Sequence, residues 1–300
     1  MSTQPGYEPS CAPRRNSLQL VVTPKVRDLG GFSVRRVLPA KSLAKVGPFV
    51  FFDEMGPAVF PPGQGIDVRP HPHIGIATVT YLFDGLIMHR DDLGYTQPIE
   101  SGAVNLMTAG RGIVHSERAG ADRDRRSTMH GIQSWMALPD GHEEIDPSFV
   151  HYPAAVLPQI ERDGAIVRVV MGNAFGVESP VHTLVPTLYL ELRMRADTRV
   201  ALPADYPERA VYIVSGSIGV DGERFGQGVM LVARAGLPLD LRCTADARLM
   251  VIGGETVGER HLWWNFVSSS AARIERAKAD WRNGAFGSID GDEEFIPLPD

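Results

Sequence analysis

Two pairs of residues with metal-binding side chains suggest where chemistry occurs in this sequence. His71 and His73 are two positions apart, and so are His115 and Glu117. Residues i and i+2 of a β-strand point to the same face, so each pair would offer two donor groups in one direction. Three neutral imidazoles and one carboxylate suit a divalent metal such as iron, nickel, copper, manganese, cobalt or zinc. Four ligands on an octahedral ion leave about two positions for substrate or oxygen, which indicates a reactive centre.

The stretch between the two pairs has the pattern of antiparallel strands. It is rich in Thr, Val, Ile and Tyr, and it is divided by turn glycines at Gly85, Gly94, Gly102, Gly110 and Gly112. A meander of this kind would return the second pair beside the first, inside a small barrel. A lone His-X-His is more often a surface or core feature, but two such pairs around one meander favour a metal site.

Other polar residues near this stretch allow two interpretations. Asp53 and Glu54 follow an apolar strand, and they are either acids that support the metal ligands or solvated residues at a strand end. His89, on the same meander, is either functional or part of a solvated loop. His130 and Trp135 could line a pocket, although packing is the simpler expectation.

Composition limits the class of protein. The chain has 300 residues, a net charge of −6 and 43% hydrophobic residues, which is enough for two domains with cores of their own. A broad basic surface is not expected, so direct binding of nucleic acid is disfavoured. Two cysteines, Cys11 and Cys243, exclude a disulfide framework. No signal-like or membrane-spanning stretch is seen, so we expect a cytoplasmic protein that is not bound to a membrane.

The second half of the sequence faintly repeats the first. Residues 212–216 correspond to 81–85, and residues 227–236 correspond to 101–110. The positions that match the four ligand candidates carry Leu202, Ala204, Leu241 and Cys243. The second barrel is therefore expected to hold no metal, and Cys243 is expected to be a small core residue.

The pattern predicts five segments. They are a disordered N-terminus (1–16), an N-terminal metal-binding barrel (17–145), a linker (146–160), a C-terminal barrel without metal (161–268), and a C-terminal helix and tail (269–300). In the helix, Ile274, Ala277 and Trp281 share one face, which should dock on a barrel. The apolar end of the tail could latch onto the body or fray.

Several motifs together resemble the pirin family, from about Leu18 to Phe286. They are HPHIGIATVTYLFDG, HRDDLG, MTAGRGIVHSE, GIQSWMALP and WWNFVSS. Pirins are bicupins of the cupin superfamily, so the resemblance implies an all-β fold of two jelly-roll-like antiparallel β-barrels with a short C-terminal α-helix. It implies one metal, with Fe(II) as the first expectation, held in the N-terminal barrel. The ligands it implies are His71, His73, His115 and Glu117. Asp92 departs from the family pattern, in which a small hydroxyl residue is expected.

The resemblance also implies a function. Bacterial-type pirins resemble quercetin 2,3-dioxygenases, in which a flavonol chelates the metal and dioxygen opens its central ring. A flavonol or related phenol and dioxygen are then the partners, and Glu117 is the expected general base. The alternative is a non-catalytic, iron-dependent redox sensor that binds a transcription factor or a metabolic enzyme. A purely structural metal is a third interpretation.

Overall fold

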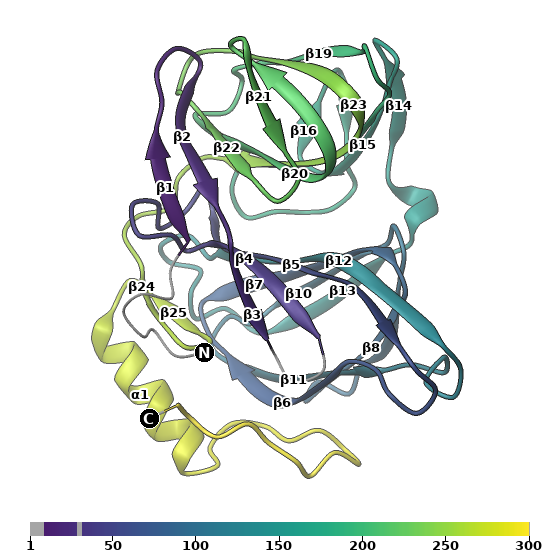
Figure 1. Cartoon of the computed structure of the whole chain (residues 1–300). Helices are drawn as coiled ribbons and strands as arrows, with labels where there is room; N and C mark the ends of the chain where they lie inside the picture. Colours follow the sequence, from purple (N-terminus) through teal and green to yellow (C-terminus); the bar gives the residue numbers. More distant parts are fainter. Residues whose placement is uncertain (1–8, 29–31, 300) are drawn as a thin grey trace.

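Two β-units lie one above the other, and an α-helix lies beside the lower one (Figure 1). The computed structural model describes residues 9–28 and 32–299, and within these ranges it contains 25 strands and one α-helix. No helix in the described part of the chain is long and apolar enough to cross a membrane.

The lower unit consists of two antiparallel sheets with an apolar core between them. The larger sheet has the order β13 (Ser148–Tyr152), β10 (Val104–Thr108), β7 (Ile76–Asp84), β12 (Ser127–Ala137), β5 (Phe49–Phe60), β4 (Ser33–Leu38) and β3 (Lys25–Asp28). The smaller has the order β6 (Asp67–His73), β11 (Ile113–Ala119), β8 (Leu86–Asp91) and β9 (Thr96–Glu100). Buried residues from both sheets, such as Met55 of β5 and Ile87 of β8, pack together between them.

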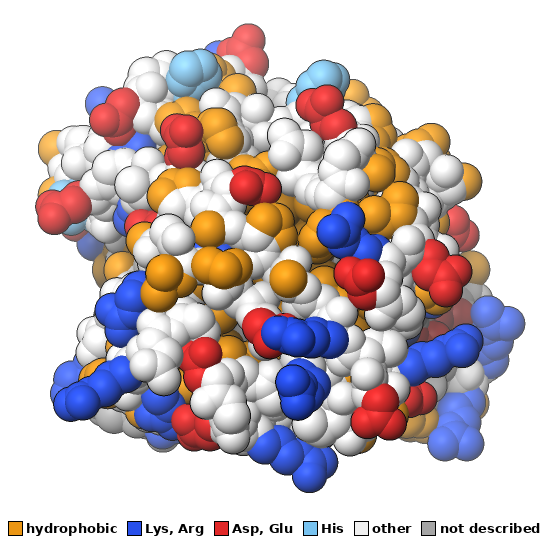
Figure 2. Space-filling model, turned by 90° about the horizontal axis from the view of Figure 1, so that it is seen from above, with side chains coloured by type: hydrophobic (Ala, Val, Ile, Leu, Met, Phe, Trp, Pro, Cys, Tyr) orange, Lys and Arg blue, Asp and Glu red, His pale blue; other side chains and the backbone are white. Residues whose placement is uncertain are grey.

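The upper unit is a ten-stranded sheet that bends around its own core. Its main path is β1 (Ser10–Pro13), β2 (Leu18–Thr23), β22 (Met230–Ala233), β20 (Glu208–Val220), β23 (Leu239–Gly254), β18 (Thr187–Met194), β15 (Ala165–Met171) and β14 (Gln159–Arg162). β19 (Arg199–Leu202) pairs with β23, and β21 (Glu223–Gly226) pairs with β20. Seen from above, its outer surface mixes basic and acidic side chains with small apolar patches (Figure 2).

The fold confirms the prediction of an all-β protein with two jelly-roll-like units and a C-terminal helix. The hydrogen-bonded sheets are open paths, however, so the units are not closed barrels in the strict sense. The two sheets of the lower unit are joined by side-chain packing instead of by a continuous ladder of hydrogen bonds.

An apolar layer joins the two units. Phe49 of β5 packs edge-to-face on Tyr189 of β18, with ring centroids 5.6 Å apart, and Phe52 packs in the same way on Tyr212 of β20 at 5.2 Å. Tyr81 of β7 donates a hydrogen bond to the buried carboxylate of Glu191 (2.7 Å). The layer is therefore mainly hydrophobic, with polar groups that find partners across it.

Two segments differ from the sequence prediction. Ser10–Pro13, expected to be disordered, form β1, which pairs with β2 at the edge of the upper sheet because the apolar residues of β2 are buried there. Residues 1–8 of the same predicted segment lie outside the described residues. Within the predicted linker, β13 pairs with β10 of the lower unit and buries Phe149. The proposed domain limits remain a prediction.

The C-terminal segment returns to the lower unit. After β24 (His261–Trp263) and β25 (Phe266–Ser268), Ser270 caps the N-terminus of α1 (Ala271–Arg282) by accepting from the backbone N–H of Arg273. Ile274 and Ala277 are buried on the docked face, as predicted. Three short elements complete the chain: β16 (Asn173–Ala174), β17 (Val177–Glu178) and the 3₁₀ turn η1 (Ala154–Val156).

Candidate metal centre

Neighbouring strands of the smaller sheet carry the predicted ligands. β6 and β11 are antiparallel partners, and His71 lies directly opposite His115 in their register. His73 is two residues from His71, so it points to the same inward face. The ligand nitrogens of the three histidines all lie within 4.8 Å of one another, and the Nε2 atoms of His73 and His115 are 3.1 Å apart. The structure therefore brings three of the four predicted ligands together.

The other ring nitrogen of His71 and of His73 faces a backbone carbonyl. Nδ1 of His71 donates to the oxygen of Arg69 (2.8 Å), and Nδ1 of His73 donates to the oxygen of Asn265 (3.1 Å). Because a carbonyl oxygen can only accept, both rings carry their proton on Nδ1. Their Nε2 lone pairs are then free and point into the cluster, as metal ligation requires.

Burial keeps these imidazoles neutral. It lowers the pKa of His71 to about 4, and its hydrogen bond to Arg69 offsets only part of that effect. Burial, reinforced by the neighbouring histidines, also holds the pKa of His73 and of His115 well below the usual value. Metals bind neutral imidazole, so the cluster is ready to bind a cation at neutral pH without first losing protons.

Glu117, the fourth predicted ligand, is not part of the close group formed by His71, His73 and His115. A β-bulge separates it from His115 on β11. Its Oε1 accepts weak hydrogen bonds from Thr80 (3.5 Å) and Gln133 (3.4 Å). Burial raises the pKa of Glu117 to about 7 against the opposing effect of these two bonds. Its carboxyl group lines the same cavity as His71 and His73.

A cavity of about 290 Å³ opens beside the cluster. One wall is aromatic, because Trp135 stacks on Phe51 with ring centroids 3.9 Å apart. Trp264 and Ile296 add apolar surface from the C-terminal segment, far from the ligands in sequence. Trp135 thus lines a pocket, contrary to the simpler expectation of packing alone. The cavity combines a flat apolar surface with nearby polar groups, as small-molecule sites commonly do.

Asp53 and Glu54 are buried, so the interpretation as solvated strand-end residues is wrong. Asp53 lines the cavity and is held by two hydrogen bonds from Arg36 (2.9 and 2.6 Å). Glu54 accepts from Tyr212 of the upper unit (2.5 Å) and from His130 (2.8 Å). Glu54 therefore joins the two units, and His130 supports it instead of lining the cavity.

His89 is also buried, and the interpretation as a residue of a solvated loop is wrong. It lies on β8, the strand on the other side of β11, with Nδ1 3.4 Å from Nδ1 of His115. Its Nε2 hydrogen-bonds to Asp91 (2.9 Å), which sequence analysis did not single out. The spacing of His89 and Asp91 repeats the i, i+2 pattern of the ligand pairs, and that signal could have identified Asp91.

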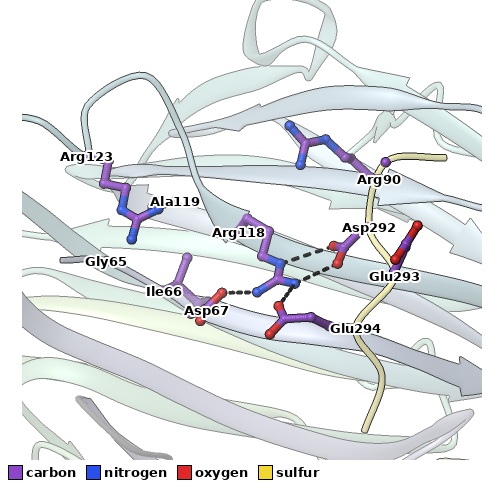
Figure 3. Close-up of a pocket in the computed structure, with 11 residues that line it drawn as sticks. Gly65, Ile66, Asp67, Arg90, Arg118, Ala119, Arg123, Asp292, Glu293 and Glu294 are labelled. Carbon is purple, nitrogen blue, oxygen red and sulfur yellow. Dashed lines mark hydrogen bonds and ion pairs between the residues drawn. The ribbon is translucent and has the colours of Figure 1, made fainter. Parts of the chain in front are cut away.

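Arg118 holds the acidic tail against the lower unit. It follows Glu117 on β11, and its guanidinium lies between Asp67 and the tail residues Asp292 and Glu294, beside a pocket of about 450 Å³ (Figure 3). It hydrogen-bonds to Asp292 (2.8 Å) and to Glu294 (2.6 Å). Further along, the N–H of Ile296 donates to the oxygen of Pro70 (2.8 Å). The tail therefore latches onto the body and contributes to the wall of the cavity.

The upper unit has no comparable cluster among the described residues. Leu202, Leu241 and Cys243 are buried in its core, which confirms the expected role of Cys243. Asp92, the residue that departs from the pirin pattern, accepts a hydrogen bond from the backbone N–H of Val114 (3.2 Å). Burial raises the pKa of its carboxyl.

Two stacked jelly-roll units, one of which holds an inward-facing histidine cluster, define a protein of the bicupin class. Sequence models of the family agree: the model for Pirin matches residues 31–136, and that for the Pirin C-terminal cupin domain matches residues 189–287. The chain is 47% identical to a pirin-like protein of Caulobacter vibrioides, with 94% of this chain and 100% of the relative covered. It therefore belongs to the pirin family, as the motifs predicted.

Solved structures are also similar to this chain. A quercetin 2,3-dioxygenase from Acinetobacter baumannii superimposes with a TM-score of 0.88 at 35% identity, covering 95% of both chains. A bacterial pirin from Escherichia coli, solved in complex with nickel(II), gives a TM-score of 0.61 at 16% identity over 78% of this chain and 96% of the other. The second likeness is evidence for the fold alone.

Proposed function

We propose that this protein is a metal-dependent dioxygenase that acts on flavonols, in the manner of a quercetin 2,3-dioxygenase. The observation that carries the proposal is the convergence of three buried, neutral imidazoles beside an aromatic-walled cavity. A dioxygenase relative that covers nearly the whole chain supports the substrate class. His71, His73, His115 and Glu117 are the proposed ligands of one divalent ion, and Fe(II) is the proposed metal.

The donor set fits such an ion. The lone pairs of His71 and His73 are directed inward by their carbonyl partners, and Glu117 lines the same cavity as these two ligands. When bound, the metal supplies Lewis acidity toward the hydroxyl and carbonyl oxygens of the flavonol, and redox chemistry toward dioxygen.

Residues of the chain orient the substrate. The stacked pair Trp135 and Phe51 offers a flat surface against which the fused rings of a flavonol can pack. The volume of about 290 Å³ lies at the lower limit of the roughly 300–1,000 Å³ of small-molecule sites, so it suits a single flat molecule. Trp264 adds a further aromatic surface to the cavity from the C-terminal segment.

Glu117 is the proposed general base. Its carboxylate would take the proton of the flavonol hydroxyl group, and the donors Thr80 and Gln133 hold the carboxyl in place. In the metal-free protein burial raises the pKa of Glu117 to about 7. A bound cation would favour the ionised carboxylate, which is the form that accepts a proton. Glu117→Gln keeps the shape of the side chain and removes the base.

The test is an oxygen-uptake assay with quercetin on protein loaded with Fe(II) and, separately, with Ni(II). We expect uptake with loaded wild-type protein, a large loss in His73→Ala, and wild-type rates in the control His142→Ala, whose side chain is exposed and hydrogen-bonds to Asp140 in its own loop. Loaded wild-type protein that consumes no oxygen with any flavonol would refute the dioxygenase and favour the regulatory alternative. An unchanged rate in Glu117→Gln would remove the base from the proposal.

A further inference from the structure

A buried pair of side chains lies behind His115, on the side away from His73. His89 and Asp91 of β8 face the same interior as the ligands, and in the register of the sheet Asp91 is opposite His115 and His89 is opposite Glu117. His89 and Asp91 are each only 2% exposed. The ring of His89 stacks on Phe149, with centroids 4.3 Å apart and planes 16° from parallel, which fixes the orientation of the imidazole.

His115 differs from the other two histidines in what holds its Nδ1. His71 and His73 each donate to a backbone carbonyl, which forces their tautomer. The partner of Nδ1 of His115 is Nδ1 of another imidazole, His89, at 3.4 Å. An imidazole nitrogen can donate or accept, so this contact alone leaves the tautomer of His115 undetermined.

Asp91 removes the ambiguity. Its Oδ1 accepts from the backbone N–H groups of Leu93 (3.1 Å) and Tyr95 (3.0 Å), and its Oδ2 lies 2.9 Å from Nε2 of His89. A carboxylate held by two N–H donors is an acceptor, so it draws the ring proton of His89 to Nε2. Nδ1 of His89 is then a lone pair. When a cation occupies Nε2 of His115, which faces the lone pair of His73 at 3.1 Å, the proton in the contact between His89 and His115 belongs to Nδ1 of His115.

We propose that His89 and Asp91 are positioning residues that hold His115 in the Nδ1–H tautomer. This leaves the Nε2 lone pair of His115 free on the side that faces His73, where a metal would bind. The inference rests on the proposed metal centre. Each of the three imidazoles is then oriented through its Nδ1 atom. Main-chain carbonyls accept from His71 and His73, and His89, itself bonded to Asp91, accepts from His115.

The test uses two variants that separate the roles. His89→Phe keeps an aromatic ring to stack on Phe149 but removes the acceptor for Nδ1 of His115. Asp91→Asn keeps an oxygen that can accept from His89, so it should keep most of the zinc affinity of the wild type. His142→Phe, at an exposed site outside the β-units, is the matched control.

Two measurements are made, and neither uses catalysis. The first is the affinity for Zn(II), measured by competition with a chromophoric chelator. We expect His89→Phe to bind about 10- to 100-fold more weakly, Asp91→Asn to lose less, and the control to match the wild type. The second is the tautomer of His89 and of His115 in zinc-loaded wild-type protein, read from long-range ¹⁵N–¹H spectra of the histidines. We expect the proton of His89 on Nε2 and the proton of His115 on Nδ1.

The outcomes distinguish this inference from the proposed function. A proton on Nδ1 of His89 in zinc-loaded protein, or wild-type zinc affinity in His89→Phe, would overturn the positioning role even if the protein is a dioxygenase. Inactivity toward flavonols with the expected tautomer and affinities would refute the enzyme and leave the inference intact. Should His89→Phe fail to fold, the tautomer of His89 in the zinc-loaded wild type decides the question.

Discussion

Glu117 should destabilise the metal-free protein at neutral and alkaline pH. Its carboxyl is buried with only two long hydrogen bonds, so burial raises its pKa to about 7 from an ordinary value of 4.5. The unfolded chain therefore loses this proton at a lower pH than the folded chain does. Glu117→Gln removes the ionisable group but keeps its size and its hydrogen-bonding oxygen.

The sign and the size of the effect follow from linkage between proton binding and folding. Below pH 4.5 the carboxyl is protonated in both states, so the substitution has little effect. Between pH 4.5 and 7 only the unfolded state ionises, and the folded state progressively loses stability as pH rises. Above pH 7 the difference is complete, and at about 1.4 kcal/mol per pH unit it amounts to about 3 kcal/mol.

Urea unfolding of chelator-treated protein at several pH values measures this difference. We expect Glu117→Gln to match the wild type near pH 4 and to exceed it by about 3 kcal/mol at pH 8. Glu161→Gln, at an exposed position, should show no such dependence. Added metal should reverse the order, because the wild type gains a ligand that the variant lacks. A variant no more stable than the wild type at pH 8 would refute the argument from burial.

Three further predictions concern the interface, the upper unit and the tail. Tyr212→Phe removes a buried hydrogen bond to Glu54 and should lower the free energy of unfolding by about 1.5–3 kcal/mol, measured in urea, with zinc affinity unchanged. Leu190→Ala, in the core of the upper unit, should cost about 2–5 kcal/mol by the same assay while the folded fraction still binds metal. Arg118→Gln releases the acidic tail and should speed extraction of bound metal by a chelator several-fold, and an unchanged rate would show that the tail does not restrict access to the cavity.

Much of the site could be predicted from the sequence because its signals are local. Strand geometry fixes that His71 and His73 share a face, whatever the rest of the chain does. The alternating pattern between the two pairs indicates antiparallel strands, which bring His115 back beside His71. The position of α1 was predictable for the same reason, since its capping residue and its apolar face lie within fifteen residues of one another.

Burial of polar residues was less predictable. Glu54 follows an apolar run, as a residue at a strand end often does. It is nevertheless buried between the two units, where Tyr212, 158 residues away along the chain, donates a hydrogen bond to it. His89 was recognised as part of the meander, but the orientation of β8 toward β11 decides that it contacts His115. Such contacts depend on which strands are neighbours, and residue type and spacing within one segment do not encode that choice.

The sequence by itself therefore determined the residue types of the site, the face of the strand on which each lies, and the family to which the chain belongs. Only the tertiary structure decided what supports them: the carbonyl of Asn265 behind His73, the tail residue Ile296 in the cavity wall, and the place of β2 in the upper sheet. The reason is physical. Periodicity follows from the covalent geometry of one segment, whereas partners across the fold are selected by the burial of all segments together.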